Sequence, residues 1–314
     1  MKIVRNDRDY FETGMSEVRV HTLVHQHDFV HRRYLVRMID CFYMREHIII
    51  ITELLNSSVC VHYMHLDTQG PARRSEYYNA ATIGALCAQM LDALKFLDSI
   101  GIAHCDVKSS NICIADSDTR QFKLIDLGSA TLRHDVHPSY LQSRWNRAPE
   151  VMLGLDWCPK VDVWSLGCVA VEVVLGYSPF QFQSCELVLA AQISMCGPLS
   201  EWMIDENSLA HMLLAPTGVA YEIDPPNVEP PGTYLLRSAP NSSLAAVLAA
   251  RVNTENFGDL SGFTSFVTEL LTLDPTHRPS AVDAIQHEWI APYHRILPAV
   301  AQPDVEPAEE QLCD

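Results

Sequence analysis

The chain has 314 residues, a length that fits one large domain or two lobes that share an interface. Apolar residues make up 48% and charged residues 19%, which excludes extensive disorder and predicts a globular protein with a sizeable core. The formal net charge of -17 argues against binding to nucleic acid or to an anionic membrane surface, and favours peptide or basic partners.

Residues 1–55 predict a small mixed lobe. Strand-like runs cover 2–5 and 35–43, and a helix is expected near 14–26. The run 47–53 is strongly apolar and also predicts a strand. The first lobe should therefore pack one helix against a few strands.

Residues 56–295 predict a second, mainly helical lobe. Between 81 and 99, apolar residues recur at three- and four-residue steps, which indicates an amphipathic helix on a core. The stretch 161–175 is apolar nearly all round and predicts a helix buried in the centre of this lobe. Its two acids, Asp162 and Glu172, then need polar partners.

Two segments are predicted to lack regular structure. Residues 216–240 hold four prolines and a glycine between Pro225 and Gly232, which is typical of a surface insertion loop. Residues 296–314 are acidic and Pro-rich, and we expect a disordered tail there.

Three short motifs carry the chemistry. They are HCDVKSSN at 104–111, DLG at 126–128 and APE at 148–150. This order is typical of protein kinases. The four identities that the first motif shares with kinases would recur by chance about once in 10^5 starting positions.

Each residue type in these motifs suits phosphoryl transfer. Asp106 would accept the proton of the substrate hydroxyl, and Lys108 would place a positive charge beside the transferring phosphate. Asn111 and Asp126 would supply oxygen ligands to Mg²⁺. A lone aspartate is by default a helix cap or an ion-pair partner, and Asp126 also suits an Asx-turn, so the assignment depends on the whole set.

The chain resembles the dual-specificity tyrosine-regulated kinases, the DYRK branch of the CMGC group of protein kinases. The segments that carry the resemblance are YFETG at 10–14, LVRM at 35–38, HCD at 104–106, YLQSR at 140–144 and LTLDP at 271–275. It implies an α+β, protein-kinase-like bilobal fold with an incomplete, β-rich N-terminal lobe. It also implies a Ser/Thr protein kinase that uses ATP and Mg²⁺ on protein substrates.

The resemblance also implies roles in nucleotide binding. Lys2 falls at the strand lysine that holds the α- and β-phosphates, and Glu17 falls at its ion-pair partner. Thr52 resembles the gatekeeper, and Glu53 and Leu55 would offer backbone groups to the adenine. The alternatives are an exposed terminal lysine for Lys2 and a solvated helix face for Glu17.

Further roles follow for the activation segment. Tyr140 resembles the tyrosine that this family phosphorylates on itself, and Arg144 and Arg147 are placed to bind such a phosphate. Ser143 resembles the residue that ties the segment to the catalytic loop. An ordinary packed tyrosine is the alternative for Tyr140.

The resemblance assigns structural roles to four more residues. Glu150 and Arg278 resemble a buried ion pair that anchors the activation segment to the helical lobe. Asp162 would accept backbone hydrogen bonds from the catalytic loop. His104 is expected to be structural rather than a proton-transfer group.

Two classes of function stay open, because only Met1 precedes Lys2 in this sequence and no Gly-rich loop that would cover the phosphates is present in it. One is an active kinase for which this sequence is incomplete. The other is a catalytically impaired pseudokinase that serves as a binding scaffold. A small-molecule kinase is disfavoured, because residues 140–150 closely resemble the segment with which protein kinases bind peptides. Ser109 and Ser110 replace the usual Pro-Glu, so no substrate consensus is transferred.

The ten cysteines show no CxxC pair and no metal-ligand spacing, which is typical of reduced thiols in a cytoplasmic or nuclear protein. Residues 1–7 lack the apolar core of a secretory signal. We also expect no apolar run long enough to span a bilayer.

Overall fold

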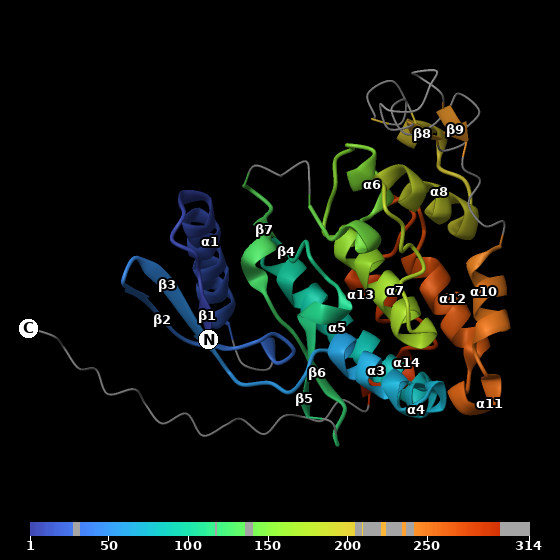
Figure 1. The fold of residues 1–314 in the computed structure, drawn as a ribbon, viewed down its shortest axis with the longest axis horizontal. Coiled ribbons are helices and arrows are strands. Elements are labelled where there is room, and N and C mark those ends of the chain that lie inside the picture. Colours follow the sequence, from blue (N-terminus) through green and yellow to red (C-terminus); the bar gives the residue numbers. More distant parts are fainter. Residues whose placement is uncertain are drawn as a thin grey trace, which may run out of the picture.

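A computed structural model describes residues 1–27, 32–116, 118–135, 141–204, 209, 221–223, 234–236 and 242–295. Figure 1 shows a small lobe of strands and one helix beside a larger, mainly helical lobe. The elements of the small lobe are β1 (Lys2–Ile3), α1 (Arg8–His25), β2 (Met38–Met44) and β3 (His47–Thr52). The two predicted lobes are therefore present.

The larger lobe contains most of the helices. These are α3 (Val59–Thr68), α4 (Pro71–Tyr77), α5 (Ala80–Ser99), α6 (Pro149–Met152), α7 (Lys160–Leu175), α8 (Cys185–Cys196), α10 (Leu244–Arg251), α11 (Thr254–Phe257), α12 (Leu260–Leu270), α13 (Ala281–Ala284) and α14 (Ala291–Arg295). Short 3-10 turns cover Ser109–Asn111, Leu127–Ser129, Arg144–Asn146 and Glu201–Ile204. Paired short strands are β4 (Ile102–Ala103) with β7 (Thr131–Leu132), β5 (Ile112–Asp116) with β6 (Gln121–Leu124), and β8 (Tyr221–Ile223) with β9 (Tyr234–Leu236).

The small lobe is an antiparallel sheet of order β1-β3-β2 with α1 packed on one face. Val4, Ile48 and Ile50 form its own small core. A Cβ at Gly14 would lie 3.0 Å from Val4 Cγ2, so glycine lets α1 approach the sheet closely. This close approach positions the inner face of α1 against Val4 and against Ile48 of β3.

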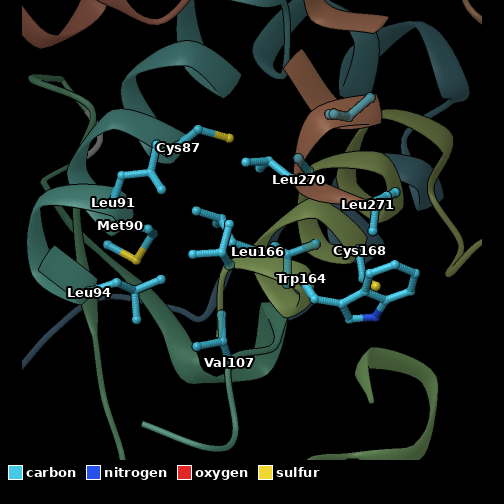
Figure 2. Packing of buried hydrophobic residues seen from close by; sticks show 14 of the residues in the cluster. Cys87, Met90, Leu91, Leu94, Val107, Trp164, Leu166, Cys168, Leu270 and Leu271 are labelled. Atoms are coloured by element: carbon cyan, nitrogen blue, oxygen red, sulfur yellow. The ribbon is translucent and has the colours of Figure 1, made fainter. Parts of the chain in front are cut away.

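The core of the larger lobe lies between α5 and α7. Figure 2 shows Cys87, Met90, Leu91 and Leu94 of α5 facing Leu166 of α7. Leu270 and Leu271 lie beside α7 in the same view. Nearly all residues of α7 are buried, as its all-round apolar pattern predicted. Fully burying one such side chain stabilises the fold by about 1.5–3 kcal/mol.

Three element boundaries differ from the prediction. Helix α1 begins at Arg8 rather than near 14, and the Arg8–Glu12 pair at 3.3 Å lies within its first turns. Strand β2 begins at Met38 rather than 35, because Val36 donates its backbone N–H to Leu124 O at 2.9 Å in the other lobe. Strand β1 covers Lys2–Ile3 rather than 2–5.

Our prediction that residues 216–240 lack regular structure was wrong. Strands β8 and β9 pair antiparallel within it, from Tyr221↔Leu236 to Ile223↔Tyr234. All four prolines fall between the two strands, so none removes a donor from the ladder. The rest of this segment and the predicted tail 296–314 lie outside the described residues.

Helix α5 corrects a second expectation. It is long and apolar enough to cross a membrane by length and composition, although 78% of its apolar window is buried inside the protein. Burial of this kind is typical of a core helix. The nine cysteines of the described part are free thiols.

Gly84 of α5 makes room for α14. A Cβ at this position would lie 2.2 Å from Cδ2 of the Tyr293 ring. We expect Gly84→Ala to destabilise the fold by about 1–3 kcal/mol through this overlap. In a Tyr293→Ala background the same change should become stabilising by about 1 kcal/mol, because alanine favours a helix over glycine. Urea unfolding of the four proteins tests this, and the same sign in both backgrounds would contradict it.

Candidate active site

The catalytic-loop motif folds into a hydrogen-bonded cluster around Asp106. Lys108 Nζ lies 2.7 Å from Asp106 Oδ2, and Asn111 Nδ2 donates to the same oxygen at 3.0 Å. Ser143 Oγ donates to Asp106 Oδ1 at 2.8 Å and accepts from Lys108 Nζ at 3.1 Å. Two predicted catalytic residues, Lys108 and Asn111, and Ser143 therefore converge on the carboxylate of a third, Asp106.

Asp162 of α7 holds the backbone of this loop. Its Oδ2 accepts from His104 N at 2.7 Å and its Oδ1 accepts from Cys105 N at 2.9 Å. Cys105 has a φ of 62°, a left-handed conformation that costs a non-glycine residue of order 1–3 kcal/mol. The two bonds from the central helix hold the loop in this strained shape.

His104 is fully buried and its ring also holds backbone. Nδ1 accepts from Asp106 N at 3.2 Å, so Nε2 carries the proton that is donated to Ile125 O at 3.1 Å. Burial lowers the pKa of His104, which keeps the ring neutral. These contacts agree with the structural role that we expected.

The pKa of Asp162 gives a pH-dependent prediction. Burial raises it to about 7, against the opposing effect of the two N–H donors. The pKa of Asp162 in the folded protein is higher than the ordinary value of 3.8. The stabilising contribution of the protonated group is therefore fully present below pH 3.8 and is lost as the pH rises to about 7. We expect the free energy of unfolding, relative to Asp162→Asn, to decrease across this window and then level off. Urea unfolding of both proteins at a series of pH values tests it, and a constant difference would contradict it.

Lys2, Glu17 and Asp126 form a second cluster. Lys2 Nζ lies 2.7 Å from Glu17 Oε2 and 2.8 Å from Asp126 Oδ1. Burial disfavours the charged lysine, but hydrogen bonds to both carboxylates raise the pKa of Lys2 overall. Burial likewise opposes ionisation of Asp126, yet the bond from Lys2 lowers its pKa. Burial raises the pKa of Glu17, although the hydrogen bond from Lys2 opposes this shift. The shifts of Lys2 and Asp126 therefore favour their charged forms.

Asp126 reaches this cluster from a left-handed backbone position, with φ 62° and ψ 79°. Its side chain accepts from Gly128 N at 3.4 Å, so the Asx-turn that we weighed as an alternative forms as well. The turn and the bond to Lys2 coexist on the same oxygen.

A cavity of about 370 Å³ lies beside this cluster and collects the residues predicted to bind nucleotide. Lys2, Glu17, Glu53, Leu55 and Asp126 all line it, together with Thr52. The Glu53 side chain is held by Lys123 Nζ at 2.5 Å and by the backbone N–H of Arg37 at 2.8 Å. This restrains the segment that follows Thr52.

A second cavity, of about 690 Å³, adjoins the Asp106 cluster. Lys108 and Ser143 lie in its wall, with Arg144, Trp145 and Asn146 of the activation segment. Asp106 is thus hydrogen-bonded to two residues that line this cavity, Lys108 and Ser143. Asp126 instead lines the cavity of about 370 Å³. Such a pair of cavities suits two reactants that meet between them.

Residues 1–290 of the chain match the family model of the protein kinase domain. The chain belongs to the protein kinase family. It is 28% identical over 312 residues to the DYRK-family kinase pom1 of Schizosaccharomyces pombe, covering 99% of this chain and 26% of that protein. It is 36% identical over 181 residues to a probable dual specificity protein kinase YAK1 homolog of Encephalitozoon cuniculi, covering 57% of this chain and 42% of the homolog.

A human relative, dual specificity tyrosine-phosphorylation-regulated kinase 4, is 26% identical over 298 residues, covering 95% of this chain and 53% of that protein. These relatives make the chain a DYRK-like kinase domain, as the motifs predicted. The chain spans about a quarter to a half of their lengths.

In the activation segment of this kinase domain, Arg147 also makes contacts that the sequence did not predict. Its side chain is buried, and Nε and Nη2 donate to the carbonyls of Leu141 and Gln142, both at 2.9 Å. These bonds give Arg147 a structural role inside the segment, and its binding of a phosphate on Tyr140 stays a prediction. Arg144 is exposed and donates to Gln183 O. Tyr140 lies outside the described residues, so its phosphorylation stays a prediction.

Gln142 is a residue that the sequence reasoning missed. It is buried at a φ of 64°, and its Nε2 donates to Val161 O at 2.9 Å and to Ser165 Oγ at 2.8 Å. Its Oε1 accepts from Ala148 N at 2.9 Å. Gln142 thereby ties the segment to α7. The only signal was its place within the YLQSR motif.

Glu172, the second acid of α7, also finds its partners at the site. Its Oε1 accepts from Tyr63 OH at 2.8 Å and from Ser109 Oγ at 2.7 Å. Ser109 is one of the two serines that depart from the usual kinase motif, so the departure provides a buried donor for Glu172. Burial raises the pKa of Glu172, although both donors oppose the shift.

Glu150 and Arg278 form the predicted buried pair. Arg278 Nη1 lies 2.7 Å from Glu150 Oε1, Nη2 lies 2.8 Å from Oε2, and neither side chain is exposed. Arg278 also donates to the carbonyls of Lys160, Thr272 and Leu273. The pair therefore fastens the end of the activation segment to the loop after α12.

Proposed function

We propose that the chain transfers the γ-phosphoryl group of ATP to serine or threonine hydroxyls of protein substrates. Two observations together support this proposal. Asp106 is hydrogen-bonded to Lys108 and Ser143, which line one cavity. Lys2, Glu17 and Asp126 form a cluster that lines the other cavity. Two of the named relatives are dual specificity kinases, and a further relative from Dictyostelium discoideum is named a probable serine/threonine-protein kinase, which supports the same reaction.

In this proposal each group acts on a defined atom. Asp106 accepts the proton of the substrate hydroxyl and aims its oxygen, while Lys108 and Asn111 hold the carboxylate in place. Lys2, oriented by Glu17, pairs with the α- and β-phosphates. Glu53 and Leu55 contribute backbone groups to the adenine.

The donor set also suits Mg²⁺. Asn111 spends its amide nitrogen on Asp106 O and Oδ2, both at 3.0 Å, which leaves its oxygen for a hard cation. Asp126 supplies the carboxylate, one oxygen of which also accepts from Lys2. When bound, Mg²⁺ neutralises charge that develops on the phosphate oxygens.

Two further points belong to the proposal. Self-phosphorylation on Tyr140 is supported by the YLQSR motif and by the dual specificity names of the relatives, with Arg144 and Arg147 as the candidates for binding the phosphate. A cytoplasmic or nuclear location is supported by the free thiols.

The test is transfer of labelled γ-phosphate from MgATP to peptides that differ only in serine, threonine or tyrosine at the acceptor. We expect labelling of the serine and threonine peptides, and labelled Tyr140 in the protein itself. Saturable nucleotide binding without any transfer would overturn the proposal and favour a binding scaffold. The longest protein that the coding sequence supports should be used.

A further inference from the structure

A small cavity lined by basic side chains lies behind the nucleotide cavity. His21 and His25 reach it from α1, Arg32 and Arg37 from the connection between α1 and β2, and Lys123 from β6. Its volume is about 10 Å³, room for a single water-sized group. Three of these side chains, Arg32, Arg37 and Lys123, are cationic, although the chain as a whole has a net charge of -17.

Arg32 contacts a nitrogen base rather than a carboxylate. Its Nη1 lies 2.9 Å from His25 Nδ1, which must be the acceptor, so that His25 is neutral when this bond forms. Its Nε is buried and has no hydrogen-bond partner among the described residues. A buried guanidinium donor that is left unpaired costs free energy, which an added acceptor would recover.

The positive charge of the cavity is only partly neutralised. Glu53 contributes a carboxylate at its edge, but Oε1 already accepts from Lys123 Nζ at 2.5 Å and from Arg37 N at 2.8 Å. Burial, then the charges of Arg32 and Arg37, lower the pKa of His25. Burial and the charge of Arg37 lower the pKa of Arg32 in the same way. Burial is the larger cause of both shifts, and only the added effect of the neighbouring arginines reflects the positive charge at this place.

We propose that this cavity is an anion site that binds a phosphoryl group through Arg32 and Arg37. One oxygen of the anion would enter the enclosed space and accept from Arg32. The other oxygens would remain at the mouth, where the exposed Arg37 reaches them. Guanidinium groups suit phosphate oxygens because their planar donors form charge-assisted bonds in pairs. The anion is either free phosphate or the phosphate of a modified side chain.

The position of the site connects it to nucleotide binding. His21 and Val36 line both this cavity and the nucleotide cavity. Helix α1 also carries Glu17, which orients Lys2. An anion held against the last turn of α1 would restrain the helix that positions this ion pair.

The test is thermal unfolding of the nucleotide-free protein with increasing sodium phosphate, at an ionic strength kept constant with sodium chloride. A ligand that binds the folded state raises the unfolding midpoint with its concentration. We expect the midpoint to rise, and Arg32→Gln/Arg37→Gln to weaken the apparent phosphate affinity by roughly tenfold or more. Arg37→Gln alone changes an exposed side chain, so it remains informative if the double variant does not fold.

Matched variants and ligands make the result decisive. Arg73→Gln/Arg133→Gln removes two exposed guanidinium groups elsewhere and should leave the phosphate response unchanged. Phosphoserine run in parallel separates the two sources, because tighter binding than free phosphate indicates a modified side chain and equal binding indicates the free anion. An unchanged midpoint with both ligands, or an equal rise in the Arg32→Gln/Arg37→Gln protein, would overturn the proposal. This readout needs no catalysis, so it does not depend on the proposed function.

Discussion

Asp106→Asn is expected to lower the turnover number for phosphoryl transfer by about 10^2 to 10^4, the usual worth of a positioned general base. In barrier terms this is roughly 3 to 5 kcal/mol. Asparagine keeps the size of the side chain and one acceptor oxygen for Ser143 or Lys108. It cannot accept the hydroxyl proton, and its amide places a donor where Asp106 Oδ2 now accepts from Lys108 and Asn111.

The measurement is steady-state transfer to a serine peptide, with the affinity for MgATP followed separately. Asp118→Asn is the matched control, because Asp118 is exposed and lies outside the cluster. We expect this control to keep its full rate. Nucleotide affinity should change little in Asp106→Asn, because the carboxylate lies outside the lining of the nucleotide cavity. An unchanged rate would remove Asp106 from the mechanism.

Arg278→Met is expected to destabilise the fold by about 3–5 kcal/mol. The substitution leaves Glu150 as a buried charge without its partner, which is more costly than never burying the pair. Arg278 also donates to three backbone carbonyls, and these would lose their donor together. Urea unfolding measures the change.

Two companion variants separate the causes. Glu150→Leu/Arg278→Met should recover part of the loss, because it removes the unpaired charge while keeping an apolar filling. Arg133→Met breaks the exposed pair with Asp98, at 3.0 Å, and should cost only about 0–1 kcal/mol. If Arg278→Met and Arg133→Met cost the same, the buried pair has no special role.

Much of the site was readable from residue type and spacing. The HCDVKSSN motif and its downstream partners predicted which side chains meet around Asp106, and α7 was predicted as a buried helix from its composition alone. Arg147 shows the limit of this reasoning. Its motif position indicated a phosphate ligand, which stays a prediction, but did not indicate that its guanidinium also donates to the carbonyls of Leu141 and Gln142. A motif specifies a residue type, but the direction of a long side chain depends on which acceptors the fold leaves unpaired.

The sequence by itself determined the family, the two-lobed architecture and the identity of the reacting groups, because these depend on local patterns that a short window contains. Only the tertiary structure decided those pairings of distant groups that no motif predicted. Lys2 meets Asp126 across 124 positions, and Gln142 meets Ser165 across 23. It also decided that Ser109 serves Glu172, and that Arg32, Arg37 and Lys123 line one basic cavity. Such contacts form only when whole elements pack together. The burial of α5 and α7 fixes the position of the surrounding backbone, and this determines which side chains can meet.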